Sequence, residues 1–176
     1  MNFISDDFVK GAHFEIGNFC IIEEGVEVGD NVKIENYSII KKGTKIGSNT
    51  VVGNYCELGK EQVIGDNVII QGRIRMGDNC VIEDNVTIKY GTILTGDVLL
   101  KEGCFLGPNV ITLGSTHKRV EVHGTIIGNN TYVGAGSKIS GGVKIGNNIT
   151  IGALSFVNKD AEESGIYVGV PVQKIK

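Results

Sequence analysis

Two of the three histidines lie in one short polar segment, Leu113 to Thr125, which reads LGSTHKRVEVHGT. His117 and His123 belong to this segment, together with the adjacent cations Lys118 and Arg119. An imidazole titrates close to neutral pH and can accept the proton of an attacking amine or hydroxyl. His117 is therefore our candidate for a general base, and the elements that flank the segment must position it.

The rest of the chain follows a period of six residues. Counting in sixes, every anchor position is aliphatic or Met from Ile16 to Leu106, and the phase resumes from Ile127 to Val157. The third position after an anchor is mostly Gly, Asn or Asp, which tolerate the left-handed backbone of a tight turn. The anchors are Ile16, Ile22, Val28, Ile34, Ile40, Ile46, Val52, Leu58, Ile64, Ile70, Met76, Ile82, Ile88, Leu94, Leu100, Leu106, Ile127, Val133, Ile139, Ile145, Ile151 and Val157.

A unit of six residues is too short for a helix but suits a short strand followed by a corner. Three units would form one triangular coil, and stacked coils would place parallel strands about 4.8 Å apart around an aliphatic core. We therefore predict an all-β, single-domain parallel β-helix over residues 12–160, with a lead-in at 1–11, a protruding loop at 113–125 and a tail at 161–176.

The loop has a definite place on this prism. Leu106 and Ile127 are 21 residues apart, so nine extra residues lie before Ile127 if Thr112 takes the next anchor position. Indexing the faces puts the loop at one corner, directly above Asp97 in the preceding coil, and puts Asn85 at a different corner. If Asn85 and the loop serve one site, they must come from neighbouring chains.

The four cysteines share one phase of the repeat. Cys20, Cys56, Cys80 and Cys104 all lie two positions before an anchor, where side chains point inward. Only Cys20 and Cys56 stack on one face, two coils or about 10 Å apart, which is too far for a disulfide. The sequence also has no CxxC pair. We predict small buried thiols that pack as apolar groups, and no metal site.

Composition excludes several classes of protein. The formal net charge of −3 provides no large basic surface, so we expect no nucleic-acid partner. The N-terminus lacks a basic region followed by an apolar run, and no stretch approaches the roughly 20 apolar residues that span a bilayer. We expect a cytoplasmic protein without a membrane partner.

The tandem repeat of an aliphatic residue and Gly resembles the hexapeptide-repeat family of left-handed β-helix proteins over residues 12–160. The segment CFLGPNVITLGSTHKRV is similar to family acyltransferases with a base histidine after the equivalent of Thr-His, and YVGVPVQKI is similar to their GxPAKxI tail. The long regular prism before the loop resembles N-acetyltransferases acting on nucleotide-linked amino sugars. The resemblance implies left-handed coils, acetyl-CoA as acyl donor, and a homotrimer with sites between subunits.

Residue chemistry, the place of the loop and the resemblance together suggest roles for particular residues. His117 would deprotonate the acceptor amine as it attacks the thioester, and Asp97 would orient the imidazole. Lys118 and Arg119 would meet a sugar-nucleotide diphosphate, and Asn85, although a turn residue, would contact the acceptor. Small residues and two lysines of the C-terminal coils would hold CoA: Gly134, Ala135, Gly136, Gly152, Ala153, Ser155, Lys159 and Lys174.

Three alternatives stay open. A sugar hydroxyl could replace the amine as acceptor, which would make the chain an O-acetyltransferase. A metal-dependent enzyme of the γ-carbonic-anhydrase type would need three converging histidines, and no histidine lies between His13 and His117 to complete the set. The prism could also be a non-catalytic scaffold.

Overall fold

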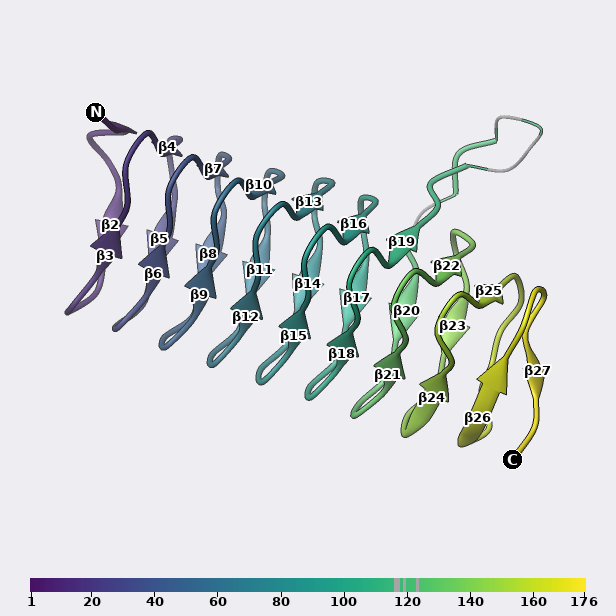
Figure 1. Ribbon diagram of the computed structural model, residues 1–176. Coiled ribbons are helices and arrows are strands. Elements are labelled where there is room, and N and C mark those ends of the chain that lie inside the picture. Colours follow the sequence, from purple (N-terminus) through teal and green to yellow (C-terminus); the bar gives the residue numbers. More distant parts are fainter. Residues whose placement is uncertain (116–117, 119, 123) are drawn as a thin grey trace.

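The computed structural model describes all of residues 1–176 except Thr116, His117, Arg119 and His123. Over the described residues the chain winds into a triangular β-solenoid of about nine coils without any helix (Figure 1). No segment of this part is therefore a helix long and apolar enough to cross a membrane. The prediction of an all-β, left-handed parallel β-helix is confirmed.

Three faces, each a sheet, enclose the core. The first face is made of β1 (Phe3–Ile4), β4 (Ile21–Ile22), β7 (Ile39–Ile40), β10 (Glu57–Leu58), β13 (Arg75–Met76), β16 (Ile93–Leu94), β19 (Ile111–Thr112), β22 (Lys138–Ile139) and β25 (Phe156–Val157). The second is made of β2 (Val9–Lys10), β5 (Glu27–Val28), β8 (Lys45–Ile46), β11 (Val63–Ile64), β14 (Val81–Ile82), β17 (Leu99–Leu100), β20 (Ile126–Ile127) and β23 (Lys144–Ile145). The third is made of β3 (Glu15–Ile16), β6 (Lys33–Ile34), β9 (Val51–Val52), β12 (Ile69–Ile70), β15 (Thr87–Ile88), β18 (Phe105–Leu106), β21 (Tyr132–Val133), β24 (Ile149–Ile151), β26 (Gly165–Val168) and β27 (Gln173–Lys174).

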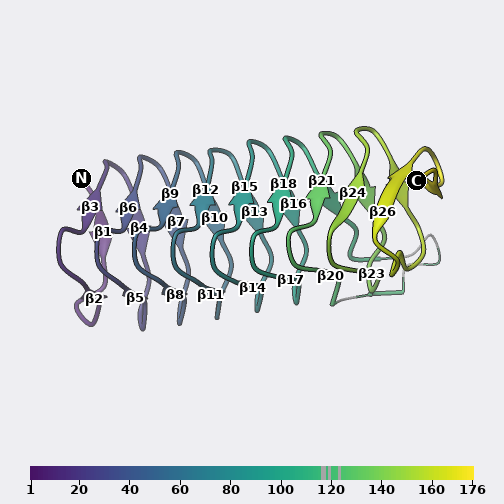
Figure 2. The same cartoon turned by 90° about the horizontal axis from the view of Figure 1, so that it is seen from below.

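From β1 to β25, each strand pairs in parallel with the strand one coil away, as seen from below in Figure 2. In the two-residue strands from β4 onward in this series, the first residue points outward and the second, the anchor, points into the core. Ile34, Ile70 and Leu106, for example, are fully buried on the third face. The aliphatic anchors therefore form one continuous core along the prism axis.

The three corners carry residues whose φ lies between 52° and 73°, the left-handed region. The loop corner joins the first face to the second and carries Gly25, Gly43, Glu61, Asn79, Asp97, the loop 113–125 and Gly142. The asparagine corner joins the second face to the third and carries Asn31, Asn49, Asn67, Asn85, Asn130 and Asn148. The aromatic corner joins the third face back to the first and carries Phe19, Tyr37, Tyr55, Arg73, Gly91, Asn109, Gly136 and Leu154.

All four cysteines are buried and free, as their phase predicts. The Sγ of Cys56 donates to the carbonyl oxygen of Gln71 at 3.0 Å, and the hydroxyl of Ser38 makes the equivalent bond to Gly53 at 2.8 Å. Burial raises the pKa of Cys56 and Cys80 to about 11 and that of Cys104 to about 12. These thiols are interior donors and lack the thiolate character of nucleophiles.

Strand pairing extends beyond the range 12–160 at both ends. β1 pairs with β4 and β2 with β5, so residues predicted as a lead-in already form part of the first coil. At the other end β26 pairs with β24, and β27 folds back antiparallel onto β26. Val172 is buried there because the tail covers the end of the apolar core, which would otherwise meet water.

Candidate functional site

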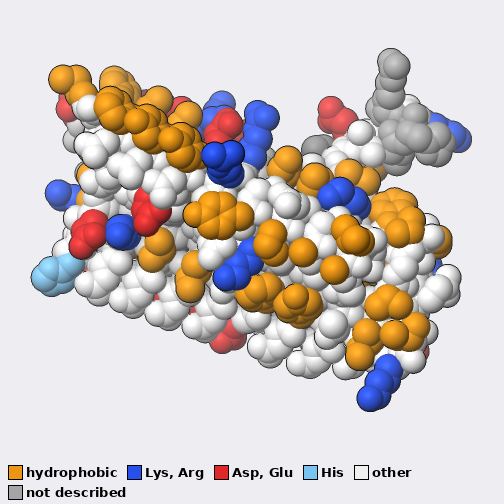
Figure 3. Space-filling view, in the orientation of Figure 1, with side chains coloured by type: hydrophobic (Ala, Val, Ile, Leu, Met, Phe, Trp, Pro, Cys, Tyr) orange, Lys and Arg blue, Asp and Glu red, His pale blue; other side chains and the backbone are white. Residues whose placement is uncertain are grey.

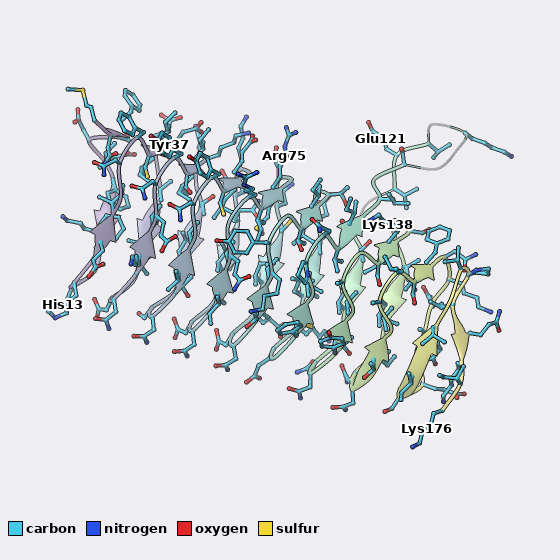
Figure 4. The ribbon with its side chains drawn as sticks, in the orientation of Figure 1. His13, Tyr37, Arg75, Glu121, Lys138 and Lys176 are labelled. Atoms are coloured by element: carbon cyan, nitrogen blue, oxygen red, sulfur yellow. The ribbon has the colours of Figure 1, made fainter. Side chains whose placement is uncertain are left out.

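The loop leaves the prism after β19, returns before β20 and projects from the loop corner (Figure 1). Its base is a short antiparallel pair in which Ser115 bridges Glu121 and the Val122 N–H donates to the Gly114 carbonyl at 2.9 Å. Figure 4 shows Glu121 out on the loop. The outgoing and returning segments of the loop thus pair into a narrow stem next to the prism.

The returning chain passes close over the next coil at Gly141. A Cβ atom there would lie 2.5 Å from the carbonyl oxygen of Leu113 and 2.7 Å from that of Val122. Real Cβ atoms do not approach backbone oxygens so closely, so the loop base needs glycine at this position.

His117, the predicted base, lies outside the described residues, as do Arg119 and His123. Their roles stay predictions. Lys118 is described and is exposed on the loop. Among the residues that the structure describes, no three His, Cys, Asp or Glu side chains gather as a metal site would require.

Asp97 lies at the loop corner one coil before the loop leaves, because β16 is in register with β19 at Ile93 and Ile111. Its φ is 60°, and its carboxylate accepts a hydrogen bond from the Asn79 side-chain amide at 3.2 Å. This neighbour holds the carboxylate at the corner below the loop. Whether Asp97 orients a histidine stays a prediction.

Asn85 lies at the asparagine corner, and the structure does not bring it together with the loop of the same chain. It has a φ of 60°, and its side chain donates to Glu102 at 3.3 Å. The backbone conformation alone accounts for asparagine at this turn. A contact with the acceptor stays a prediction.

The small residues predicted to bind CoA stack on the aromatic corner in two neighbouring coils, after β21 and after β24. A Cβ atom at Gly134 would lie 2.4 Å from the backbone nitrogen of Ala153, so coil packing by itself requires glycine at 134. Leu154 projects from this corner with 76% of its surface exposed, next to Gly136. In these two coils the corner therefore combines small residues with the exposed side chain of Leu154.

Ser155 differs from the other residues of this set. Its side chain is buried, and its Oγ accepts the backbone N–H of Gly169 at 3.1 Å. Ser155 lies two positions before the anchor Val157, the phase that points inward. Its hydroxyl binds the C-terminal tail inside the prism, and a contact with CoA stays a prediction.

The two lysines predicted to meet phosphate lie away from the aromatic corner. Lys159 follows β25 at the loop corner, Lys174 is on β27, and both line a hollow at the C-terminal end with Tyr167. Lys174 forms an exposed ion pair with Glu163 at 2.9 Å, which raises the pKa of the lysine and lowers that of the glutamate. Within one chain, the lysines and the small residues therefore belong to different surfaces.

The outward residues of two faces form apolar stripes, which were not among the site residues predicted from the sequence. Along the second face, the outward residues between Lys45 and Lys144 form the second-face stripe. Along the third face, the outward residues between Lys33 and Thr150 form the third-face stripe. In the sequence, these outward residues stand one position before each anchor. Charged residues occupy this position in the two coils before each stripe, and mostly apolar residues occupy it in the middle coils. The apolar residues are Val63, Val81, Leu99 and Ile126 on the second face, and Val51, Ile69, Phe105 and Tyr132 on the third, where Thr87 lies between Ile69 and Phe105.

Two family models of hexapeptide repeats match segments of this chain. The model described as "Bacterial transferase hexapeptide (six repeats)" matches residues 25–60 and 124–159, and the "Hexapeptide repeat of succinyl-transferase" matches 57–90. The two models together cover more than half of the chain. No match was found among curated proteins.

Solved structures share the fold. UDP-N-acetylglucosamine acyltransferase from Bacteroides fragilis is 21% identical with a TM-score of 0.87, over 99% of this chain and 72% of its own. A mutant of perosamine N-acetyltransferase from Caulobacter crescentus, in complex with CoA and GDP-perosamine, is 25% identical with a TM-score of 0.57, over 76% of this chain and 56% of its own. The chain thus spans little more than half the length of the perosamine enzyme.

Proposed function

This chain belongs to the hexapeptide-repeat family of bacterial transferases, and on that premise we propose that it transfers an acetyl group from acetyl-CoA to the amine of a nucleotide-linked amino sugar. The observation that carries the proposal is the single interruption of the prism at 113–125, a loop that holds two of the three histidines. Catalytic groups commonly lie on polar loops that protrude from a rigid scaffold.

The reaction needs one base and no covalent enzyme intermediate. The amine nitrogen attacks the thioester carbonyl while His117 accepts its proton, and a backbone N–H stabilises the oxyanion of the tetrahedral intermediate. The C–S bond then breaks, and the proton passes from His117 to the departing CoA thiolate. Asp97, one coil below, would orient the imidazole.

The loop cations would bind the acceptor, and the small residues of the aromatic corner would bind CoA. Lys118 and Arg119 would meet the diphosphate of the acceptor, and the pantetheine arm of CoA would lie along the corner that carries Gly134 and Gly152. Lys159 and Lys174 would meet CoA phosphates as point charges from the C-terminal end.

We further propose a homotrimer in which the second face of one copy packs against the third face of the next. The apolar stripes support this arrangement, because they occupy the same middle coils on two adjoining faces. A heterologous contact of this kind closes into a ring. The loop corner of one copy would then lie beside the aromatic corner of its neighbour, so a site between copies would draw on the loop of one and on Gly134 and Gly152 of the other.

The decisive experiment measures thiol release from acetyl-CoA with a panel of nucleotide-linked amino sugars. We expect turnover with the wild-type chain, and a fall in kcat of about a hundredfold or more in His117→Ala with acetyl-CoA affinity retained. His13→Ala, at the exposed first coil, is the control and should retain full activity. Full activity in His117→Ala would refute the base, and turnover with sugar hydroxyls alone would assign O-acetylation.

A further inference from the structure

Thr112 is the one anchor in the aliphatic series from Ile16 to Val157 that carries a hydroxyl. It is the second residue of β19, is 1% exposed, and is followed directly by the loop. An aliphatic residue would satisfy the core equally well at this position. The hydroxyl therefore needs a separate explanation.

The regular hydrogen-bond ladder of the first face changes at this residue. Elsewhere on this face, the N–H that follows one anchor donates to the carbonyl oxygen of the anchor one coil on, as Gly59 does to Met76 at 3.0 Å and Gly77 to Leu94 at 2.8 Å. At Thr95 the same N–H donates instead to the Oγ1 of Thr112, at 2.8 Å. A side-chain oxygen thus takes the place of the main-chain carbonyl.

Thr95 makes a second contact with the same hydroxyl. The two Oγ1 atoms of Thr95 and Thr112 are 3.0 Å apart, within hydrogen-bond distance. Thr95 also supports the loop stem, since a Cβ atom at Gly114 would lie 3.0 Å from its Cγ2. The pair therefore connects the preceding coil to the exit of the loop.

The substitution of acceptors has a physical consequence. A buried N–H without an acceptor is destabilising, so a chain that turns its carbonyl away from the ladder needs a replacement oxygen. The Thr112 hydroxyl provides that oxygen, and the peptide after Thr112 can then leave the prism without an unpaired N–H at Thr95. The strand pairing agrees, because β16 and β19 pair at Ile93 and Ile111 alone.

We propose that Thr112 is a positioning residue, whose hydroxyl bond to the Thr95 N–H sets the direction in which the loop 113–125 leaves the prism. As a consequence for catalysis, which rests on the proposed function, loss of this bond would change the direction of the loop and lower kcat. A misplacement of about 1 Å at a catalytic group can reduce the rate about a hundredfold.

The test compares Thr112→Val, which keeps the shape but removes the hydroxyl, with Thr112→Ser, which keeps the hydroxyl. In Thr112→Val we expect at least a several-fold faster amide hydrogen exchange at Thr95 and a several-fold change in tryptic cleavage after Lys118. We expect kcat to fall about tenfold while acetyl-CoA affinity is kept, and Thr112→Ser to restore all three measurements. Thr92→Val, which removes a buried hydroxyl bonded to the Gly107 carbonyl away from the loop, is the matched control and should keep kcat and loop cleavage.

The exchange and cleavage measurements do not depend on the reaction, so they distinguish the two proposals. If His117→Ala keeps full activity but Thr112→Val alters exchange and cleavage, the proposed function fails and the positioning role stands. Unchanged exchange, cleavage and kcat in a folded Thr112→Val chain would overturn the positioning role. If Thr112→Val does not fold, Thr112→Ala, which also removes the acceptor of the Thr95 N–H, takes its place in the same measurements. Unchanged exchange and loop cleavage in that variant would refute the role.

Discussion

The rings of Tyr37 and Tyr55 stack with centroids 4.9 Å apart and planes 1° from parallel. Phe19 continues the stack on one side at 5.1 Å, and the Arg73 guanidinium covers the other end at 5.8 Å. Figure 3 shows the hydrophobic run along this edge, and Figure 4 labels Tyr37 on it. All four residues have φ of 58° or 59°, where bulky side chains are disfavoured, so ring stacking must offset backbone strain.

Replacing Tyr37 by Asn should lower the free energy of unfolding by about 1 kcal/mol. Asn tolerates the left-handed backbone, so relief of strain offsets part of the two lost stacking contacts, worth about 0.5–1.5 kcal/mol each. Thermal or urea unfolding would measure the difference. Tyr37→Phe, which keeps the ring, is the control, and equal stability of the two variants would contradict a stabilising stack.

The buried cysteines predict a loss of stability at alkaline pH. The ordinary thiol pKa is about 9, and burial raises the pKa of Cys56 and Cys80 to about 11 and of Cys104 to about 12. Above pH 9 the unfolded chain therefore loses thiol protons that the folded chain retains, so the free energy of unfolding falls as pH rises toward 11. A variant with Ser at these three positions keeps the donors and should show a shallower fall, measured by denaturant unfolding between pH 8 and about 10.5. An identical slope in both proteins would refute this linkage.

Gly141→Ala should impair catalysis more than folding. The added Cβ atom would meet the carbonyl oxygens of Leu113 and Val122, which forces the loop base to shift. We expect kcat to fall about tenfold or more, by the same argument from misplacement. Gly53→Ala is the control, because its Cβ would meet the backbone of Gln71 at 2.9 Å, far from the loop. Steady-state kinetics and melting curves should show lower stability but normal kcat for that control, and equal kcat losses would contradict a local effect.

Lysine in either apolar stripe should dissociate the proposed trimer. Val81→Lys on the second face and Ile69→Lys on the third would each bury a charge in the interface, which costs several kcal/mol without a partner. Sedimentation should detect monomers in both variants, and kcat should fall because the proposed trimer divides the site between copies. Ile93→Lys, on the exposed first face, is the matched control and should stay trimeric. A trimer in both stripe variants would exclude this packing.

Asp97→Asn tests the orienting carboxylate without disturbing the corner. Asn is well suited to a φ of 60°, so the prism should keep its melting temperature. If the carboxylate orients His117, kcat should fall by about a hundredfold or more while KM for acetyl-CoA changes little. The pH-rate profile would separate this role from a structural one, since loss of the charge should lower the pKa of the base. Wild-type kcat in this variant would remove Asp97 from the mechanism.

The sequence by itself determined the repeating part of the molecule. Anchors at every sixth position, with Gly and Asn at the turns, specify a coil locally, and each coil pairs only with its neighbours. Because each coil depends only on its neighbours, counting residues was enough to predict three features. These are the place of the loop, the inward direction of the cysteines and the corner that carries Asn85. Within this frame the sequence also located the single interruption, at 113–125.

Tertiary structure decided what counting could not. The inward rotation of Ser155, the ion pair that holds Lys174, and the exchange of a carbonyl for the Thr112 hydroxyl all depend on atoms from other coils or from the tail. The two apolar stripes indicate an interface between copies only when the faces that carry them are known to be neighbours. A six-residue period specifies the backbone of each coil, whereas these contacts depend on three-dimensional packing between coils.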